Sequence, residues 1–151
     1  MNETISKWLS MSRDELDEIY LNSQPGRIPD GDTRGTAIVT GALLSRSYAK
    51  LVRLFAWQGK IFDLFAADKS AGILINKTLP LGLSFIVAQV YIDKSWMDGK
   101  DTIVIDYSKT SLLAKMIRDE IREVEPGVYL GKVWFGKTRV LDFALTYKDS
   151  H

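Results

Sequence analysis

Residues 125–147 read EPGVYLGKVWFGKTRVLDFALTY, and this stretch decides the fold. Apolar and β-branched residues fill two runs, 128–135 and 138–147, and each run has the length of a strand. Glu125-Pro126-Gly127 precedes the first run and Gly136-Lys137 separates the two, and both sequences are typical of tight turns. The stretch therefore predicts consecutive strands joined by short turns, as in an antiparallel meander.

Much of the chain after the first thirty residues also favours strands. Apolar runs bounded by turn residues predict strands over residues 33–40, 60–66, 72–77, 84–93, 102–107 and from about 120 to 124. Asp98-Gly99 predicts the turn that separates two of these strands. Short strands at intervals of 8 to 12 residues are typical of an antiparallel sheet or barrel.

The N-terminal region predicts a helix. Ser12 and Glu15 have the spacing of a capping box, in which each side chain satisfies a backbone amide of the other residue. Asp14 and Glu15 also favour the positive end of a helix dipole. We expect a helix over about 13–22, which ends before Pro25-Gly26.

A longer helix is predicted over 41–57, where apolar residues recur at helical spacing. Its opposite face is basic and carries Arg46, Lys50 and Arg53. Two interpretations stay open. This face is either the solvated side of an ordinary core helix or a stripe that contacts the phosphate groups of a membrane surface or an anionic ligand. A further short helix is predicted over 112–117.

Together these elements predict an α+β fold that is mainly antiparallel β, with a barrel or strongly curved sheet after one or two N-terminal helices. A chain of 151 residues buries about 69% of its surface on folding, which is enough for one core. We expect a single domain over 1–151, with a helical N-terminal segment over 1–31 and a barrel-like core over 32–147.

The composition excludes several chemistries. The chain has no Cys, so disulfides, thiolate nucleophiles and Cys-ligated metals are excluded. Its one His is His151, the last residue, and chain termini are usually poorly ordered. We therefore expect no metal and no cofactor. The formal net charge is +1, which disfavours nucleic-acid binding.

The sequence also bears on the compartment. The N-terminus MNETISKWLSM lacks the basic start and apolar stretch of a secretory signal. The longest apolar region, Leu79 to Ile92, is shorter than the roughly 20 residues that a transmembrane helix needs. We expect a cytoplasmic protein.

Candidate catalytic residues follow from what remains. Without Cys or an internal His, acid–base chemistry falls to carboxylates and tyrosines, and Asp106, Tyr107 and Glu120 are the candidates. A buried Asp106 needs a partner, for which Arg118 or Arg122 has the right charge. In a strand over 118–124, Glu120 and Arg122 share one face. Such a charged pair is either a structural bridge or part of a ligand site.

Aromatic side chains make up 11% of the chain and are spread over the predicted strands. Most belong to the core, but in a barrel some line a pocket, where a few polar groups orient a ligand. The predicted ligand-binding residues are Arg118, Arg122, Gln89, Tyr91, Phe85, Tyr129 and Trp57.

Three stretches together resemble a known family. They are DTRGT (32–36) leading to WQGKIFD (57–63), DGK (98–100) before IVIDYS (103–108), and RDEIREV (118–124) before PGVYLG (126–131). The last is similar to the late hairpin of lipocalin-like (calycin-type) β-barrel proteins, many of them uncharacterised bacterial proteins. The resemblance implies a barrel with an internal apolar pocket, which typically holds a small hydrophobic ligand.

Three functions are compatible with these observations. The first is binding of a small hydrophobic or amphipathic molecule or lipid in an internal pocket. The second is a cofactor-independent enzyme, such as a cyclase, isomerase or lyase, that uses carboxylate and tyrosine chemistry in the same pocket. The third is a module that contacts a membrane or another protein.

Overall fold

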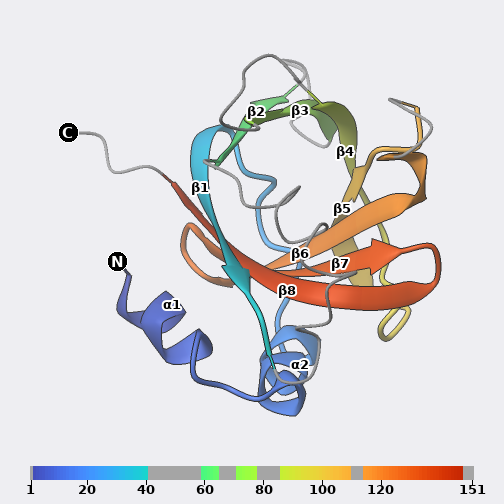
Figure 1. Cartoon of the computed structure of the whole chain (residues 1–151). Coiled ribbons are helices and arrows are strands. Elements are labelled where there is room, and N and C mark those ends of the chain that lie inside the picture. Colours follow the sequence, from blue (N-terminus) through green and yellow to red (C-terminus); the bar gives the residue numbers. More distant parts are fainter. Residues whose placement is uncertain (1, 41–58, 65–70, 78–85, 110–113, 148–151) are drawn as a thin grey trace.

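The computed structural model describes residues 2–40, 59–64, 71–77, 86–109 and 114–147, and it is an antiparallel barrel with two N-terminal helices (Figure 1). The eight strands are β1 (Gly31–Ile38), β2 (Gly59–Leu64), β3 (Ala71–Lys77), β4 (Ile86–Lys94), β5 (Asp101–Asp106), β6 (Ile117–Glu125), β7 (Val128–Phe135) and β8 (Thr138–Tyr147). Each strand pairs with the next, and β8 pairs with β1, which closes the sheet. The predicted α+β class, with a mainly antiparallel barrel, is confirmed.

The hairpin of β7 and β8 has the predicted boundaries. The two strands pair from Val128 with Thr146 to Phe135 with Thr138. Gly127 and Gly136 adopt positive φ angles of 75° and 61°. Only glycine adopts such angles readily, which explains why these residues stand where the chain turns.

The helices α1 (Glu3–Trp8) and α2 (Arg13–Leu21) precede the barrel. Ser12 and Glu15 form the predicted capping box: Ser12 N donates to Glu15 Oε2 at 2.7 Å, and Glu15 N donates to Ser12 Oγ at 3.3 Å. Helix α1 was not predicted from the sequence. This helix has only six residues, and it buries Ile5 and Trp8.

Three predicted segments differ from the described structure by two residues or more. Strand β1 covers Gly31–Ile38 rather than 33–40. Strand β6 begins at Ile117, three residues before the predicted start, because it pairs with β7 from Ile117 opposite Phe135 onward. Of the helix predicted over 112–117, the described part contains a short 3-10 helix, η2 (Ala114–Met116), and Ile117 belongs to the strand. The predicted helix over 41–57 lies outside the described residues.

Strand alternation gives the barrel two faces, and both are buried over part of its wall. The inner face holds one apolar cluster, which includes Ile103, Ile121, Val133 and Phe143. On the outer face of β7 and β8, a second cluster packs side chains of α1 and α2 against the wall. Its members are Ile5, Trp8, Leu16, Tyr20, Ile38, Val128, Leu130 and Ala144.

The segment that joins α2 to β1 packs against the inner cluster. Ile28 is buried within that cluster, and the hydroxyl of Tyr129 donates to the carbonyl oxygen of Arg27 at 2.8 Å. Glu123 of β6 accepts from the amide of Arg27 at 3.0 Å. These contacts attach the N-terminal region to the barrel from its interior as well as from its outer face.

Candidate functional site

The candidate site is a buried tyrosine–aspartate pair inside the barrel. Tyr107 directly follows β5 and Asp119 belongs to β6, and the Tyr107 hydroxyl donates to Asp119 Oδ2 at 3.0 Å. Tyr107 is 2% exposed and Asp119 is fully buried. The register places Asp119 opposite Ile105 on β5 and Val133 on β7, and both belong to the inner apolar cluster.

This arrangement has a defined chemical capacity. A carboxylate and a phenol that meet in apolar surroundings provide polar groups that can orient a ligand whose remaining surface is apolar. The same two groups are a proton acceptor and a weak acid. Of the three predicted catalytic residues, Tyr107 is the one that faces the interior.

Asp119 is a functional candidate that was not predicted from the sequence. It stands next to Glu120, which was chosen instead, and successive side chains of a strand point to opposite faces. The signal that identifies Asp119 is its spacing of two residues from the apolar Ile117 and Ile121. Those residues face the interior, and Asp119 faces it with them.

Asp106 was expected in the pocket but lies on the outer face, because it alternates with Tyr107. It accepts from the Tyr91 hydroxyl at 2.8 Å and from the Ser108 amide at 2.8 Å. Burial alone would raise the pKa of Asp106, but hydrogen bonds from Ser108 and Tyr91 and the charge of Arg118 hold it below its usual value. Burial and the hydrogen bond to Asp106 raise the pKa of Tyr91 to about 12.

Glu120, the third predicted catalytic residue, also lies on the outer face, where it is fully buried. Its Oε2 accepts from the hydroxyls of Ser95 at 2.6 Å and Tyr20 at 3.2 Å. Its Oε1 accepts from Trp96 N at 2.9 Å and from Arg118 Nε at 3.1 Å. These donors fix the loop over 95–100 and α2 against the barrel, so the geometry of Glu120 is that of a structural anchor.

Arg122 is buried beneath α2 rather than in the interior. Its guanidinium binds Asp98 through two hydrogen bonds of 2.9 and 2.8 Å and donates to the carbonyl oxygen of Tyr20 at 3.1 Å. Its Cζ also lies 4.5 Å from the centre of the Tyr20 ring. Asp106 was expected to form an ion pair with one of these arginines. Instead, Arg122 forms an ion pair with Asp98, and Arg118 forms one with Glu120.

The remaining predicted ligand-binding residues divide into three groups. Gln89 is exposed and pairs in register with Asp106 of the outer face, and Tyr91 shares that face. Tyr129 is buried in the inner cluster, and its hydroxyl is bound to Arg27. Phe85 and Trp57 lie outside the described residues, as do the basic residues Arg46, Lys50 and Arg53.

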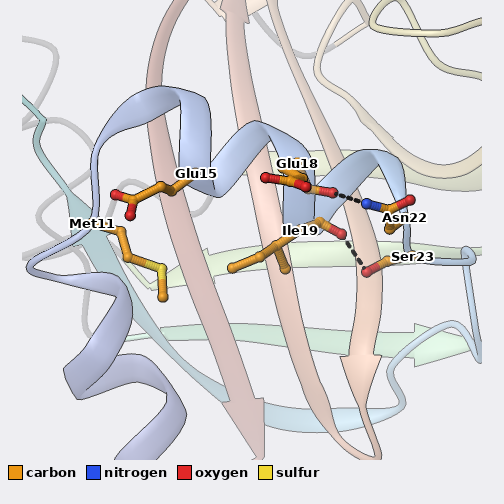
Figure 2. Close-up of a pocket in the computed structure, with 6 residues that line it drawn as sticks. All are labelled: Met11, Glu15, Glu18, Ile19, Asn22 and Ser23. Atoms are coloured by element: carbon orange, nitrogen blue, oxygen red, sulfur yellow. Dashed lines mark hydrogen bonds between the residues drawn. The ribbon is translucent and has the colours of Figure 1, made fainter.

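A shallow groove lies along α2 on the outside of the molecule (Figure 2). Met11 and Ile19 extend to the same side of the helix, and Glu15 and Glu18 also line the groove. The Glu15 carboxylate accepts from Ser12 in the capping box. Asn22 and Ser23 donate to helix carbonyls at 2.9 and 2.7 Å. The polar groups of the groove therefore form hydrogen bonds mainly within α2 and its caps.

Two features are absent from the described part of the chain. Among these residues, no group of three or more His, Asp or Glu side chains is placed to hold a metal ion. None of the described helices combines the length and the apolar character that a membrane span requires.

Comparisons with known proteins bear on the fold. No family model matches the chain, and no curated protein matches it in sequence. It is similar in structure to a protein from Thermomonospora curvata whose crystal structure is known. The TM-score is 0.60 and the identity is 16%, and the match covers 97% of this chain and 94% of the other. The likeness shows a shared sheet-rich, barrel-like fold.

Proposed function

We propose that the barrel interior binds a small hydrophobic or amphipathic molecule or lipid, whose polar group contacts the Tyr107–Asp119 pair. The observation that carries the proposal is the position of this pair. Among the described residues, these two polar side chains lie beside apolar members of the inner cluster such as Ile105, Ile121 and Val133. Binding sites for small apolar ligands combine a mainly apolar lining with a few placed polar groups.

The resemblance to lipocalin-like barrels supports the same function. Strand β6 contains RDEIREV, and PGVYLG covers the turn after it and the first residues of β7; these are the residues similar to the late hairpin of those proteins. The closed antiparallel order of the strands agrees with this resemblance. We therefore include the chain among lipocalin-like ligand-binding proteins as part of the proposal.

The outer face offers a matched control for the test. Tyr91 and Asp106 form the same kind of pair as Tyr107 and Asp119, with a hydroxyl-to-carboxylate distance of 2.8 Å against 3.0 Å. The outer pair does not face the interior. Substitutions Tyr107→Phe and Asp119→Asn can therefore be compared with Tyr91→Phe and Asp106→Asn, which make the same chemical changes on the outer face.

The experiment has two parts. Native mass spectrometry of protein purified from its own host shows whether a small molecule is retained. Titration with N-phenyl-1-naphthylamine, a neutral apolar fluorophore, then measures binding by each variant. We expect the inner-pair variants to change the affinity and the outer-pair variants to leave it unchanged. Absence of both a retained molecule and saturable dye binding in the native protein would overturn the proposal.

A second candidate function rests on the same pair. A carboxylate next to a phenol in a buried site can transfer protons without a cofactor, as an isomerase, cyclase or lyase requires. If the protein is such an enzyme, the molecule it retains is converted on incubation with the native protein. Asp119→Asn would then abolish the conversion while the molecule still binds. Retention without conversion favours binding alone.

A further inference from the structure

Aromatic and basic side chains gather on the outer surface beside the turn between β7 and β8. The rings of Trp96 and Trp134 meet edge to face, with centres 5.6 Å apart. Lys137 Nζ lies 3.6 Å from the centre of the Trp96 ring, and Arg118 Cζ lies 4.5 Å from it. The Gly136 amide in the turn donates to the carbonyl oxygen of Met116 at 2.8 Å, which brings η2 to the same place.

We call this surface the aromatic–basic patch. Its centre is Trp96, Arg118, Trp134 and Lys137, and Met116 and Phe135 lie beside it, next to Gly136 of the turn. Three of its apolar side chains are exposed although they are large. Met116 is 47% exposed, Trp96 is 39% exposed and Phe135 is 38% exposed. Large apolar side chains that gather on a surface indicate contact with an apolar partner.

Two segments beside the patch carry basic side chains and no acidic ones. Residues 107–118 and 132–141 contain no Asp or Glu, although they supply both the η2 region and the turn. Within the described part of the chain, Lys109, Lys115 and Lys137 form no ion pair, whereas Arg118 is paired with Glu120 and Arg139 with Asp17. Three unpaired lysines therefore lie in these two segments.

From these observations we infer that the aromatic–basic patch docks on a membrane surface that contains anionic lipids. Tryptophan is favoured at the boundary between lipid headgroups and hydrocarbon, and Met116 and Phe135 supply side chains that can enter the hydrocarbon. Lysines near an anionic leaflet each strengthen binding by about 1 kcal/mol, which is roughly a fivefold gain in affinity. The patch thus combines the apolar and the electrostatic parts of an interfacial site.

Nucleic acid fits the same surface less well. Proteins that bind single strands stack bases on aromatic faces that are open to solvent. The Trp96 ring instead has Lys137 and Arg118 over it and the Trp134 ring at its edge. Met116 and Phe135 also have no role in binding a phosphate backbone, whereas they have one in a lipid surface.

The inference does not depend on a ligand in the barrel. Trp96, Arg118, Trp134 and Lys137 lie on the outer face and in the β7–β8 turn, and Met116 and Phe135 lie at the end of the barrel beside that turn. Tyr107 and Asp119 instead face the interior. A Tyr107→Phe variant should therefore bind vesicles as the native protein does. Failure of ligand binding and failure of vesicle binding can consequently be told apart.

The test is co-sedimentation with vesicles of phosphatidylcholine alone and of phosphatidylcholine mixed with phosphatidylglycerol. The charge variant is Lys137→Gln and the apolar variant is Phe135→Ser. Their controls are Lys7→Gln and Leu9→Ser on and just after α1, which Figure 1 shows on the side away from the β7–β8 turn. Leu9 is 43% exposed, so it matches Phe135. Circular dichroism confirms that each variant is folded.

We expect binding to the anionic vesicles only, weakened by added salt and reduced about fivefold by Lys137→Gln. Phe135→Ser should reduce binding as well, and both α1 variants should leave it unchanged. Absence of vesicle binding, equal binding to both kinds of vesicle, or equal loss in Lys137→Gln and Lys7→Gln overturns the inference. Binding of an RNA or DNA oligonucleotide through Lys137, without vesicle binding, assigns the patch to nucleic acid instead.

Discussion

Lys132 Nζ of β7 lies 2.8 Å from Asp17 Oδ1 of α2, and this ion pair joins the helix to the outer face of the barrel. The Lys132 side chain is fully buried, and Asp17 is 20% exposed. Arg139 also pairs with Asp17, and Asp142 Oδ2 lies 3.2 Å from Lys132 Nζ. Charge therefore holds α2 in place together with its apolar residues.

Loss of Lys132 should be strongly destabilising. Lys132→Met leaves the carboxylates of Asp17 and Asp142 without their shared cation in a buried place. Removal of one partner from a buried ion pair costs about 3–5 kcal/mol of unfolding free energy. Urea denaturation measures the change. The control is Lys7→Met in the exposed Lys7–Glu3 pair, where we expect a change of less than about 0.5 kcal/mol. A similar loss in both variants would contradict the role of Lys132.

Substitution of three acidic residues should lower the unfolding free energy in the order of the number of buried donors that each residue satisfies. Glu120→Ala removes the acceptor of four donors at a fully buried position, and we expect a loss of about 3 kcal/mol or more. Asp106→Ala removes a partly buried acceptor of Tyr91 and Ser108, with a loss of about 1–2 kcal/mol. Glu3→Ala, at an exposed position, should change stability by less than about 0.5 kcal/mol. Denaturation of the three variants checks the order, and hydrogen exchange of the Trp96 amide should quicken only in Glu120→Ala.

The close contact of Gly131 with Phe143 should make the two positions depend on each other. A Cβ atom on Gly131 would lie 2.3 Å from Phe143 Cζ inside the barrel. Gly131→Ala forces the ring to move, and overpacking of this kind costs about 1–3 kcal/mol. In the double variant with Phe143→Leu, the smaller side chain should remove most of the added cost. Additive losses in a double-mutant cycle would show that the two side chains do not compete for space.

The pH dependence of stability should carry two opposite contributions. Burial raises the pKa of Asp142 above its ordinary 3.8, so its contribution favours folding in acid and is lost as the pH rises through the raised pKa. Hydrogen bonds from Arg122 lower the pKa of Asp98 below 3.8, so its contribution is present above that value and is lost as the pH falls through the lowered pKa.

Denaturation from acid to neutral pH tests both signs. Relative to the native protein, Asp142→Asn should cost most stability in acid and least at neutral pH. Asp98→Asn should show the reverse, with its largest cost at neutral pH. If the two variants diverged from the native protein in the same direction as the pH rises, one of the two assignments would be wrong.

Much of the barrel could be predicted because its signals are local. The runs 128–135 and 138–147 gave the correct strands of the last hairpin, since turn residues at Gly127 and Gly136 bound them. Helix α2 was predicted from its capping box. Helix α1 was missed because a six-residue helix has few local signals, and much of its stability comes from burial of Ile5 and Trp8.

The candidate site could be predicted only in part. Alternation correctly separated Glu120 and Arg122 from Asp119, but it did not tell which set faces the interior. An apolar inner face and a polar outer face would have settled this. Here the first six residues of β7 are all buried, so both faces of that strand resemble a core.

The sequence by itself determined the strands, their turns, the capped helix, and the absence of cysteine chemistry, because each depends on neighbouring residues or on composition. Only the tertiary structure decided that α2 and the loop over 95–100 cover the outer face. That cover makes Glu120, Arg122 and Lys132 buried anchors and leaves Tyr107 with Asp119 in the interior. The physical reason is that burial of a charged side chain depends on what packs against it, and these partners stand far away in the chain.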